Sequence, residues 1–167
     1  MMSSIGDAGL GFVRCMSGAD RHQVVGILTN VDNMSLADAR VETRLPTQDL
    51  ERARRWYADK LGLVATEERE GGLRYECAAG IFCLFASAGT PDGTFTQMAF
   101  DVDDIEAEMA ELRDRGVVFE DYGIPGLPMV DGIVDIPGNY PSKGRGERGA
   151  WFRDSEGNLI GLGQATR

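Results

Sequence analysis

The sequence predicts an α+β fold of two similar modules, each with the element order β-α-β-β-β. The stretch RLPTQDLERARRWYADKLGLVATEE, at residues 44–68, has a degenerate echo in AFDVDDIEAEMAELRDRGVVFED, at residues 99–121. In both, an apolar segment leads into Asp-Leu or Asp-Ile, a charged amphipathic helix, a glycine and a second apolar strand. Such an internal duplication restricts both the fold and the place where a ligand can lie. The corresponding positions are Asp49 with Asp104, and Gly62 with Gly116.

The first module begins with a strand at 41–46, which its proline closes. The next glycine, Gly62, supplies the left-handed residue that ends a helix, and a strand begins directly after it. Segments 73–77 and 81–86, joined by Ala-Ala-Gly, predict a β-hairpin. The helix itself is predicted by apolar residues that share one face: Leu50, Ala53, Tyr57 and Leu61.

The second module repeats this order. Residues 96–102 alternate like a strand, and Asp103 with Glu106 forms an Asp-x-x-Glu variant of the capping box. Gly116 ends the helix, and Val-Val-Phe begins a strand. A closing hairpin is predicted at 150–153 and 159–164, around the turn Asp-Ser-Glu-Gly-Asn. The apolar stripe of the helix consists of Ile105, Met109 and Leu112.

One long irregular stretch, residues 123–149, interrupts the second module and holds four of the six prolines. Loops of this length in a compact domain are usually functional or disordered. Residues 130–136 alternate enough to form a strand inside it. Its second part is basic, which fits either a solvated turn cluster or a rim that attracts an anionic ligand. The cations are Lys143, Arg145 and Arg148.

Composition and charge exclude several classes of partner. The formal net charge of −10 opposes phosphate backbones and anionic lipid, so we expect neither nucleic acid nor membrane as a partner. No apolar run approaches the roughly 18 residues that cross a bilayer. Three cysteines are too few and too irregularly spaced for a disulfide framework, which favours a reducing cytoplasm. Residues 1–37 lack periodicity and predict a loosely ordered tail, and residues 38–167 form the domain.

The phrases LPTQDLERARRWYADKLGL, FDVDDIEAEMAELRDRGVVF and AWFRDSEGNLIGLGQ carry a family resemblance. Together they resemble the vicinal oxygen chelate superfamily, the group of glyoxalases, bleomycin-resistance proteins and dioxygenases. In the last phrase, Ser155 stands where the family usually has proline. The resemblance implies that two modules, at about 39–88 and 94–165, curl a mixed sheet into a cup. Ligands would lie in the cup, the helices would pack outside, and a homodimer would complete the arrangement.

The resemblance also implies where the family's enzymes hold a divalent metal. The four positions fall on Glu42, Cys83, Gln97 and Gly161. Glycine offers no side chain, and a thiolate is a soft ligand beside hard oxygens, so we expect no metal cofactor. An extradiol dioxygenase needs two histidines and a carboxylate to hold iron. The one histidine of this chain, His22, lies outside both modules, so we do not expect this activity.

The residues predicted to contact a small organic ligand are Glu42, Arg44, Tyr75, Cys83, Gln97, Trp151 and Gly161. Glu42 and Arg44 share a strand face, so they either anchor a ligand or form an internal ion pair. The strand aromatics are Tyr75, Phe82, Phe85 and Trp151; half of them must face the helices instead, and parity alone does not say which. Tyr57 is expected in the core.

Three functions remain open from the sequence. The first is a metal-free small-molecule binding protein. The second is a lyase or isomerase with Glu42 as general base, with or without a metal. The third is a non-catalytic interaction subunit, and fold resemblance alone does not decide between them.

Overall fold

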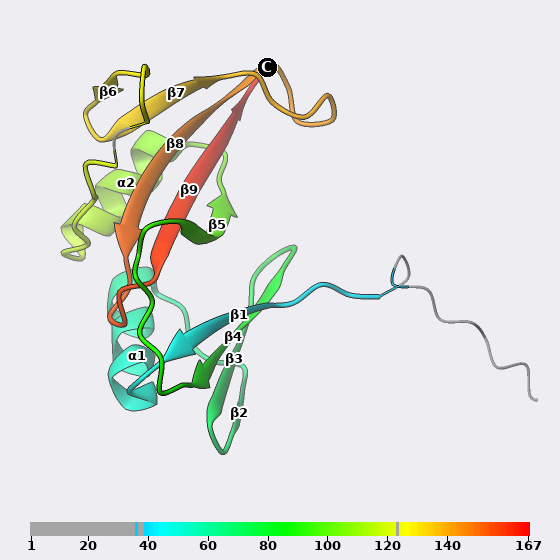
Figure 1. Cartoon of the computed structure of the whole chain (residues 1–167), viewed down its shortest axis with the longest axis vertical. Coiled ribbons are helices and arrows are strands. Elements are labelled where there is room, and N and C mark those ends of the chain that lie inside the picture. The colour runs from blue at the N-terminus through cyan, green and yellow to red at the C-terminus, as the bar shows by residue number, and fades with distance from the viewer. Residues whose placement is uncertain (1–35, 37–38, 123) are drawn as a thin grey trace, which may run out of the picture. The chain divides into compact units, whose positions relative to one another are not determined.

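Two mixed β-sheets, each covered by helix on one face, make up the described part of the chain (Figure 1). The computed structural model describes residues 36, 39–122 and 124–167, of which Arg40–Arg167 form a single unit. The predicted tail at 1–37 lies, apart from Leu36, outside the described residues. No helix in the described part is long and apolar enough to cross a membrane.

The first module contains four strands in the order β1-β4-β3-β2, with β1 parallel to β4 and the other pairs antiparallel. Its helical segment covers one face of this sheet. The elements are β1 (Thr43–Thr47), α1 (Leu50–Trp56), the π-helical turn η2 (Tyr57–Leu61), β2 (Glu67–Arg69), β3 (Gly72–Glu76) and β4 (Ile81–Ala86).

The second module has the same strand order with one short strand added at the edge, β5-β9-β8-β7-β6. Its edge strand β5 is parallel to β9, as β1 is to β4. Figure 1 shows α2 behind the sheet that contains β8 and β9. The elements are β5 (Thr96–Asp101), α2 (Ile105–Asp114), β6 (Met129–Val130), β7 (Ile133–Pro137), β8 (Gly146–Arg153) and β9 (Leu159–Thr166). The predicted α+β fold of two β-α-β-β-β modules is confirmed.

Both helices begin in the same way. The N-cap residues Asp49 and Asp104 have φ of −134° and −139° with ψ of 98°, and each side chain accepts a backbone N–H three residues on. The predicted capping box at Asp103 is therefore wrong by one residue. Its supposed partner, Glu106, is instead hydrogen bonded to Arg148. Gly62, with φ of 68°, ends the first helix in the left-handed conformation as predicted.

A continuous apolar core joins the two modules. The helix stripes predicted from the sequence supply its centre, with Ala53, Tyr57, Ile105 and Met109 fully buried. Aromatic rings extend this core across the first sheet, where Tyr75 and Phe82 stack at 4.8 Å between centroids. Burial of such side chains stabilises each by about 1.5–3 kcal/mol.

Two strand predictions need correction. Pro46 lies inside β1 rather than closing it. Because β1 is an edge strand, the N–H group that proline lacks costs the sheet no hydrogen bond. The strand expected after Gly116 is reduced to a bridge between Phe119 and Phe152.

The missing strand is explained by the way the chain pairs with β8. Phe119 is paired with Phe152, and Val134 is paired with Gly149. Between these two pairs the chain uses 15 residues beside a stretch of β8 that is only three residues long. About twelve residues therefore leave the edge as an excursion, which contains β6. We call the described residues 121–122 and 124–132 the edge excursion.

Candidate functional site

The open face of the first sheet, away from the helix, carries a cavity of about 220 Å³. Alternation along β4 creates it, because Phe82 and Leu84 are buried towards the helix while Cys83 and Phe85 point the other way. The lining adds charged side chains from β2 and β3 and from the start of β1. All of the lining residues belong to the first module.

Charged side chains on this face are arranged mostly as ion pairs. Arg44 and Glu42 lie 3.4 Å apart, which is the internal ion pair that the sequence left as an alternative. Arg74 lies between two carboxylates, those of Glu76 and Glu67, and both raise the pKa of its guanidinium. All of these groups except Glu76 line the cavity, which therefore carries both positive and negative charges.

Cys83 lies at the centre of the face, and its thiol donates to Glu42 Oε1 at 2.8 Å. Burial raises the pKa of this thiol, and the hydrogen bond to Glu42 raises it further. The thiol is therefore neutral at neutral pH, and it is not an activated nucleophile. Cys77 instead packs against the core, so the two thiols have different environments.

The structure brings some of the predicted site residues together and separates others. Glu42, Arg44 and Cys83 line the cavity. Tyr75 does not, because its side chain is 1% exposed and lies in the core on the helix side of the sheet. Its predicted ligand contact is corrected to core packing, since strand parity could not be fixed before the turns were known. Phe85 is the strand aromatic that reaches the cavity.

Trp151 and Gly161 meet on the open face of the second sheet, where they are paired across β8 and β9. A Cβ built at Gly161 would lie 3.5 Å from the indole nitrogen, so the indole covers this glycine. The ring is fixed by a 3.0 Å hydrogen bond from Nε1 to Thr96 Oγ1 and by Tyr122, whose ring centroid lies 5.2 Å away. The edge excursion supplies Tyr122 and further apolar residues that pack on the indole: Ile124, Leu127 and Met129.

The four positions that the family uses for metal do not fit a divalent ion in this chain. The indole of Trp151 occupies the space beside Gly161, and the Glu42 carboxylate already accepts the Cys83 thiol. Gln97 lies at a bulge in β5, and its buried Oε1 has no hydrogen-bond partner in the structure. Within the described ranges, no three His, Cys, Asp or Glu side chains are placed to hold a metal.

Restoring the missing ligand should therefore damage the protein rather than create a metal site. In Gly161→Glu, a Cβ would lie 3.2 Å from Ala99 Cβ, 3.4 Å from Thr96 Cγ2 and 3.5 Å from the indole nitrogen, so the longer side chain must displace some of these neighbours. We expect a loss of about 2–3 kcal/mol in the free energy of unfolding. Urea denaturation and tryptophan fluorescence measure the two effects. Gly80→Glu is the matched control, since a Cβ at Gly80 meets nothing within 4 Å. A stable Gly161→Glu variant with stoichiometric metal would contradict this reading of the site.

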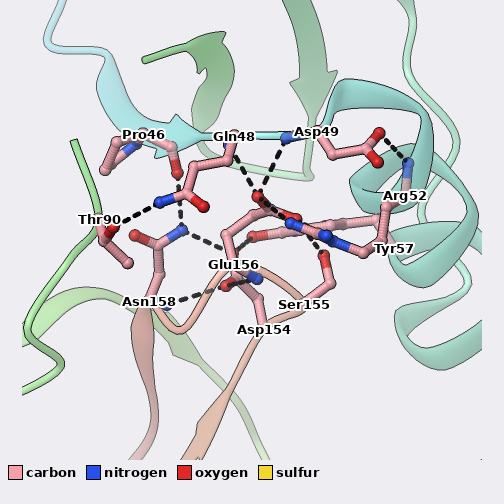
Figure 2. A network of polar contacts seen from close by, with 10 residues as sticks. All are labelled: Pro46, Gln48, Asp49, Arg52, Tyr57, Thr90, Asp154, Ser155, Glu156 and Asn158. Atoms are coloured by element: carbon pink, nitrogen blue, oxygen red, sulfur yellow. Dashed lines mark hydrogen bonds and ion pairs between the residues drawn. The ribbon is translucent and has the colours of Figure 1, made fainter. Parts of the chain in front are cut away.

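A second group of polar residues lies in the turn between β8 and β9 and connects that turn to the first module by hydrogen bonds (Figure 2). The buried Asp154 carboxylate accepts the Tyr57 hydroxyl at 2.9 Å and the Asn158 amide at 2.8 Å. The same amide donates to the carbonyl of Pro46 in β1, at 3.1 Å. We call Asp154, Glu156 and Asn158 the turn triad.

Glu156 binds the beginning of α1. Its fully buried carboxylate accepts the backbone N–H groups of Gln48 and Asp49, at 2.7 and 3.2 Å. Arg52, in the first turn of the helix, donates to both carboxylate oxygens at 2.9 Å. This places a negative charge where the helix dipole and the unpaired N–H groups favour it.

The two acids of the turn triad have opposite pKa shifts. Burial raises the pKa of Asp154, and the hydrogen bonds from Asn158, Glu156 and Tyr57 only partly offset this. Burial also acts to raise the pKa of Glu156. There the bonds from Arg52 and from the backbone of Gln48 and Asp49 outweigh burial and lower the pKa.

From the sequence, the three residues of the turn triad are predicted only as part of the turn of the closing hairpin, with no partner elsewhere in the chain. The structure instead pairs Glu156 with Arg52 over 104 residues of chain. The available indication was two acids and an amide clustered inside an otherwise apolar hairpin.

The basic part of the long stretch is largely neutralised within the protein. Lys143 pairs with Asp101 at 2.5 Å, and Arg148 pairs with Glu106 at 2.7 Å and Asp135 at 3.6 Å. These pairs favour the turn-cluster interpretation over a basic rim.

Comparison with known proteins adds a family and a set of similar folds. The family model for the glyoxalase/bleomycin resistance protein/dioxygenase superfamily matches residues 39–162. A comparison with curated proteins found no match. An antibiotic-binding protein from Streptomyces is 26% identical, with a TM-score of 0.52 over 79% of this chain and 100% of its own.

Two further solved structures show the same fold at lower identity. A glyoxalase/bleomycin resistance protein/dioxygenase from Nocardioides is 22% identical, with a TM-score of 0.53 over 77% of this chain and 86% of its own. A bleomycin-binding protein, solved with bleomycin, is 18% identical, with a TM-score of 0.53 over 77% of this chain and 99% of its own.

Proposed function

Because the chain belongs to the glyoxalase/bleomycin resistance protein/dioxygenase superfamily, we propose that it binds a small organic molecule without the family's divalent metal. The observation that carries the proposal is the first-module cavity, which combines the Phe85 side chain with polar groups at Glu42 and Arg44. An apolar surface with a few polar groups is the usual composition of a small-molecule site. The similarity to an antibiotic-binding protein supports the same class of function.

We propose further that a second copy of the chain completes the site. The first-module cavity is lined by one module only, whereas a ligand pocket usually encloses most of its ligand.

The shared strand order and helix caps support an origin of the two modules by duplication. We also propose a reducing cytoplasm as the location of the protein, and the free thiols of Cys77 and Cys83 support this.

A lyase or isomerase is the second candidate, and the position of Glu42 is what favours it. Its carboxylate is 30% exposed and borders the cavity, so it could accept a proton from a bound substrate. Two existing partners, the Cys83 thiol and Arg44, already occupy this carboxylate, which favours the binding function.

A ligand screen combined with metal analysis tests the proposal. Aromatic fragments and aromatic antibiotics should shift the backbone amide signals of β3 and β4, and purified protein should contain substoichiometric metal. Phe85→Ala should weaken the best ligand about 5- to 10-fold, through loss of one aromatic contact. Phe95→Ala is the control, because Phe95 is 60% exposed and outside the cavity lining.

Three results would count against this function. Stoichiometric metal that is lost in Glu42→Gln would overturn the metal-free site. Turnover of a bound ligand that is lost in the same variant would establish the enzyme instead. No shifted signals on the first module would favour an interaction subunit.

A further inference from the structure

We propose that the ligand of the first-module cavity is a flat carboxylate, whose acid group is bound by Arg69 and whose rings lie on Phe85. This inference rests on the proposed binding function and adds the chemical class of the ligand. It follows from the pairing of the charges, from a glycine under Arg69 and from the register of the strands.

Arg69 is the cavity-lining cation without a carboxylate partner among the described residues. Arg44 has Glu42, and Arg74 has both Glu67 and Glu76. The Arg69 guanidinium makes only a 3.3 Å hydrogen bond to the backbone oxygen of Glu70. Its remaining N–H groups, in a planar fork suited to a carboxylate, are thus available to a ligand.

Gly72 gives this guanidinium its position. A Cβ built at Gly72 would lie 3.3 Å from Arg69 Nε and 3.5 Å from its Cζ. The Arg69 side chain, although exposed, therefore lies across the glycine. Even a methyl group at this position would require the Arg69 side chain to shift from its place over the sheet.

Strand register places an aromatic ring next to the guanidinium. Phe85 on β4 is paired with Gly72 on β3, and Gly72 is paired with Arg69 on β2. All three residues line the same cavity. Since β2 and β4 are two strand spacings apart, or about 10 Å, one or two fused rings span the distance from Phe85 to Arg69.

The overall charge of the protein makes this one cation decisive. With a net charge of −10, long-range electrostatics oppose the approach of an anion. Selection of a carboxylate over a neutral analogue must then come from short-range contact with the free guanidinium.

Titration with 2-naphthoate and its neutral analogue 2-naphthamide, followed by the backbone amide signals of Gly72 and Phe85, tests the inference. We expect the wild-type protein to bind the carboxylate at least about 10-fold more tightly than the amide. Arg69→Gln should abolish this preference, because it weakens carboxylate binding much more than amide binding, and Gly72→Ala should reduce it. Arg55→Gln is the matched control, an exposed arginine outside the cavity lining.

Each outcome decides one of the two proposals. Equal binding of both probes at Phe85, or a carboxylate preference that survives in Arg69→Gln, overturns the anion site and leaves the binding function standing. Binding of neither probe to the first module overturns the carboxylate ligand, and with a negative fragment screen it overturns the function too. A preference that is present in the wild-type protein and in Arg55→Gln, reduced in Gly72→Ala and lost in Arg69→Gln establishes the site.

Discussion

Replacement of Asp154 by alanine should lower the free energy of unfolding by about 3–5 kcal/mol, the largest loss expected from one polar residue of this protein. Its carboxylate accepts four hydrogen bonds, from the Tyr57 hydroxyl, the Asn158 side chain and the backbone N–H groups of Glu156 and Asn158. In the variant the Tyr57 hydroxyl and the two backbone N–H groups lose this acceptor, and the Asn158 amide keeps only its bond to the carbonyl of Pro46. Urea denaturation monitored by circular dichroism gives the change.

Two further variants separate the hydrogen bonds from other effects. Tyr57→Phe removes one bond of the four and should cost about 1–2 kcal/mol. Asp59→Ala, an exposed acid on the same helical segment, should change stability by less than about 0.5 kcal/mol. A loss below about 1 kcal/mol in Asp154→Ala would show that the turn triad does not hold the modules together.

Glu156→Gln should cost about 2 kcal/mol at neutral pH, the second large effect. The amide keeps the shape of the side chain, and its oxygen can still accept the N–H groups of Gln48 and Asp49, which both bond to Oε2. Its NH2 group, however, replaces the oxygen that accepts Arg52 Nε, so the ion pair with Arg52 and the negative charge at the beginning of the helix are lost. Glu70→Gln, at an exposed acid outside the cavity lining, is the control and should stay near wild type.

The stability difference between wild type and Glu156→Gln should depend on pH. The pKa of Glu156 is lowered in the folded protein from an ordinary value of 4.5, so its contribution is fully present above 4.5. The contribution disappears as the pH falls through the lowered folded pKa. The raised pKa of Asp154 gives the opposite pH dependence, since the contribution of Asp154 to the free energy of unfolding decreases as the pH rises above 3.8. A pH-independent difference in Glu156→Gln would show that its charge does not stabilise the fold.

Local sequence determines much of this fold, and those parts were predictable. Asp49 and Gly62 mark the helix limits because a short acidic side chain satisfies free N–H groups and glycine accepts a positive φ. The hairpins follow from alternation interrupted by turn residues. The break in the second module's edge was not predictable, because residues 117–119 have the composition of a strand. Only the pairing with Phe152 shows where the chain leaves the sheet.

The candidate site was predictable only in part, for a related reason. The family resemblance predicts Glu42 and Cys83, strand parity adds Arg44 beside Glu42, and all three line one cavity. Tyr75 lies on the other face because the turn after β3 sets its direction. Arg69 was missed, since its role depends on the absence of a side chain on a neighbouring strand, at Gly72.

The binding of Glu156 to the beginning of α1 has a consequence for synthesis on the ribosome. The helix is made early, yet two N–H groups before it have their acceptor 107 and 108 residues further along the chain. While the nascent chain ends before the β8–β9 turn, these groups can be bonded only to water, and Tyr57 lacks its carboxylate partner. The first module therefore becomes fully stable only after the last hairpin has left the exit tunnel. Before that moment the apolar residues of the first module that pack against the second module remain exposed, and a prematurely terminated chain would expose them permanently.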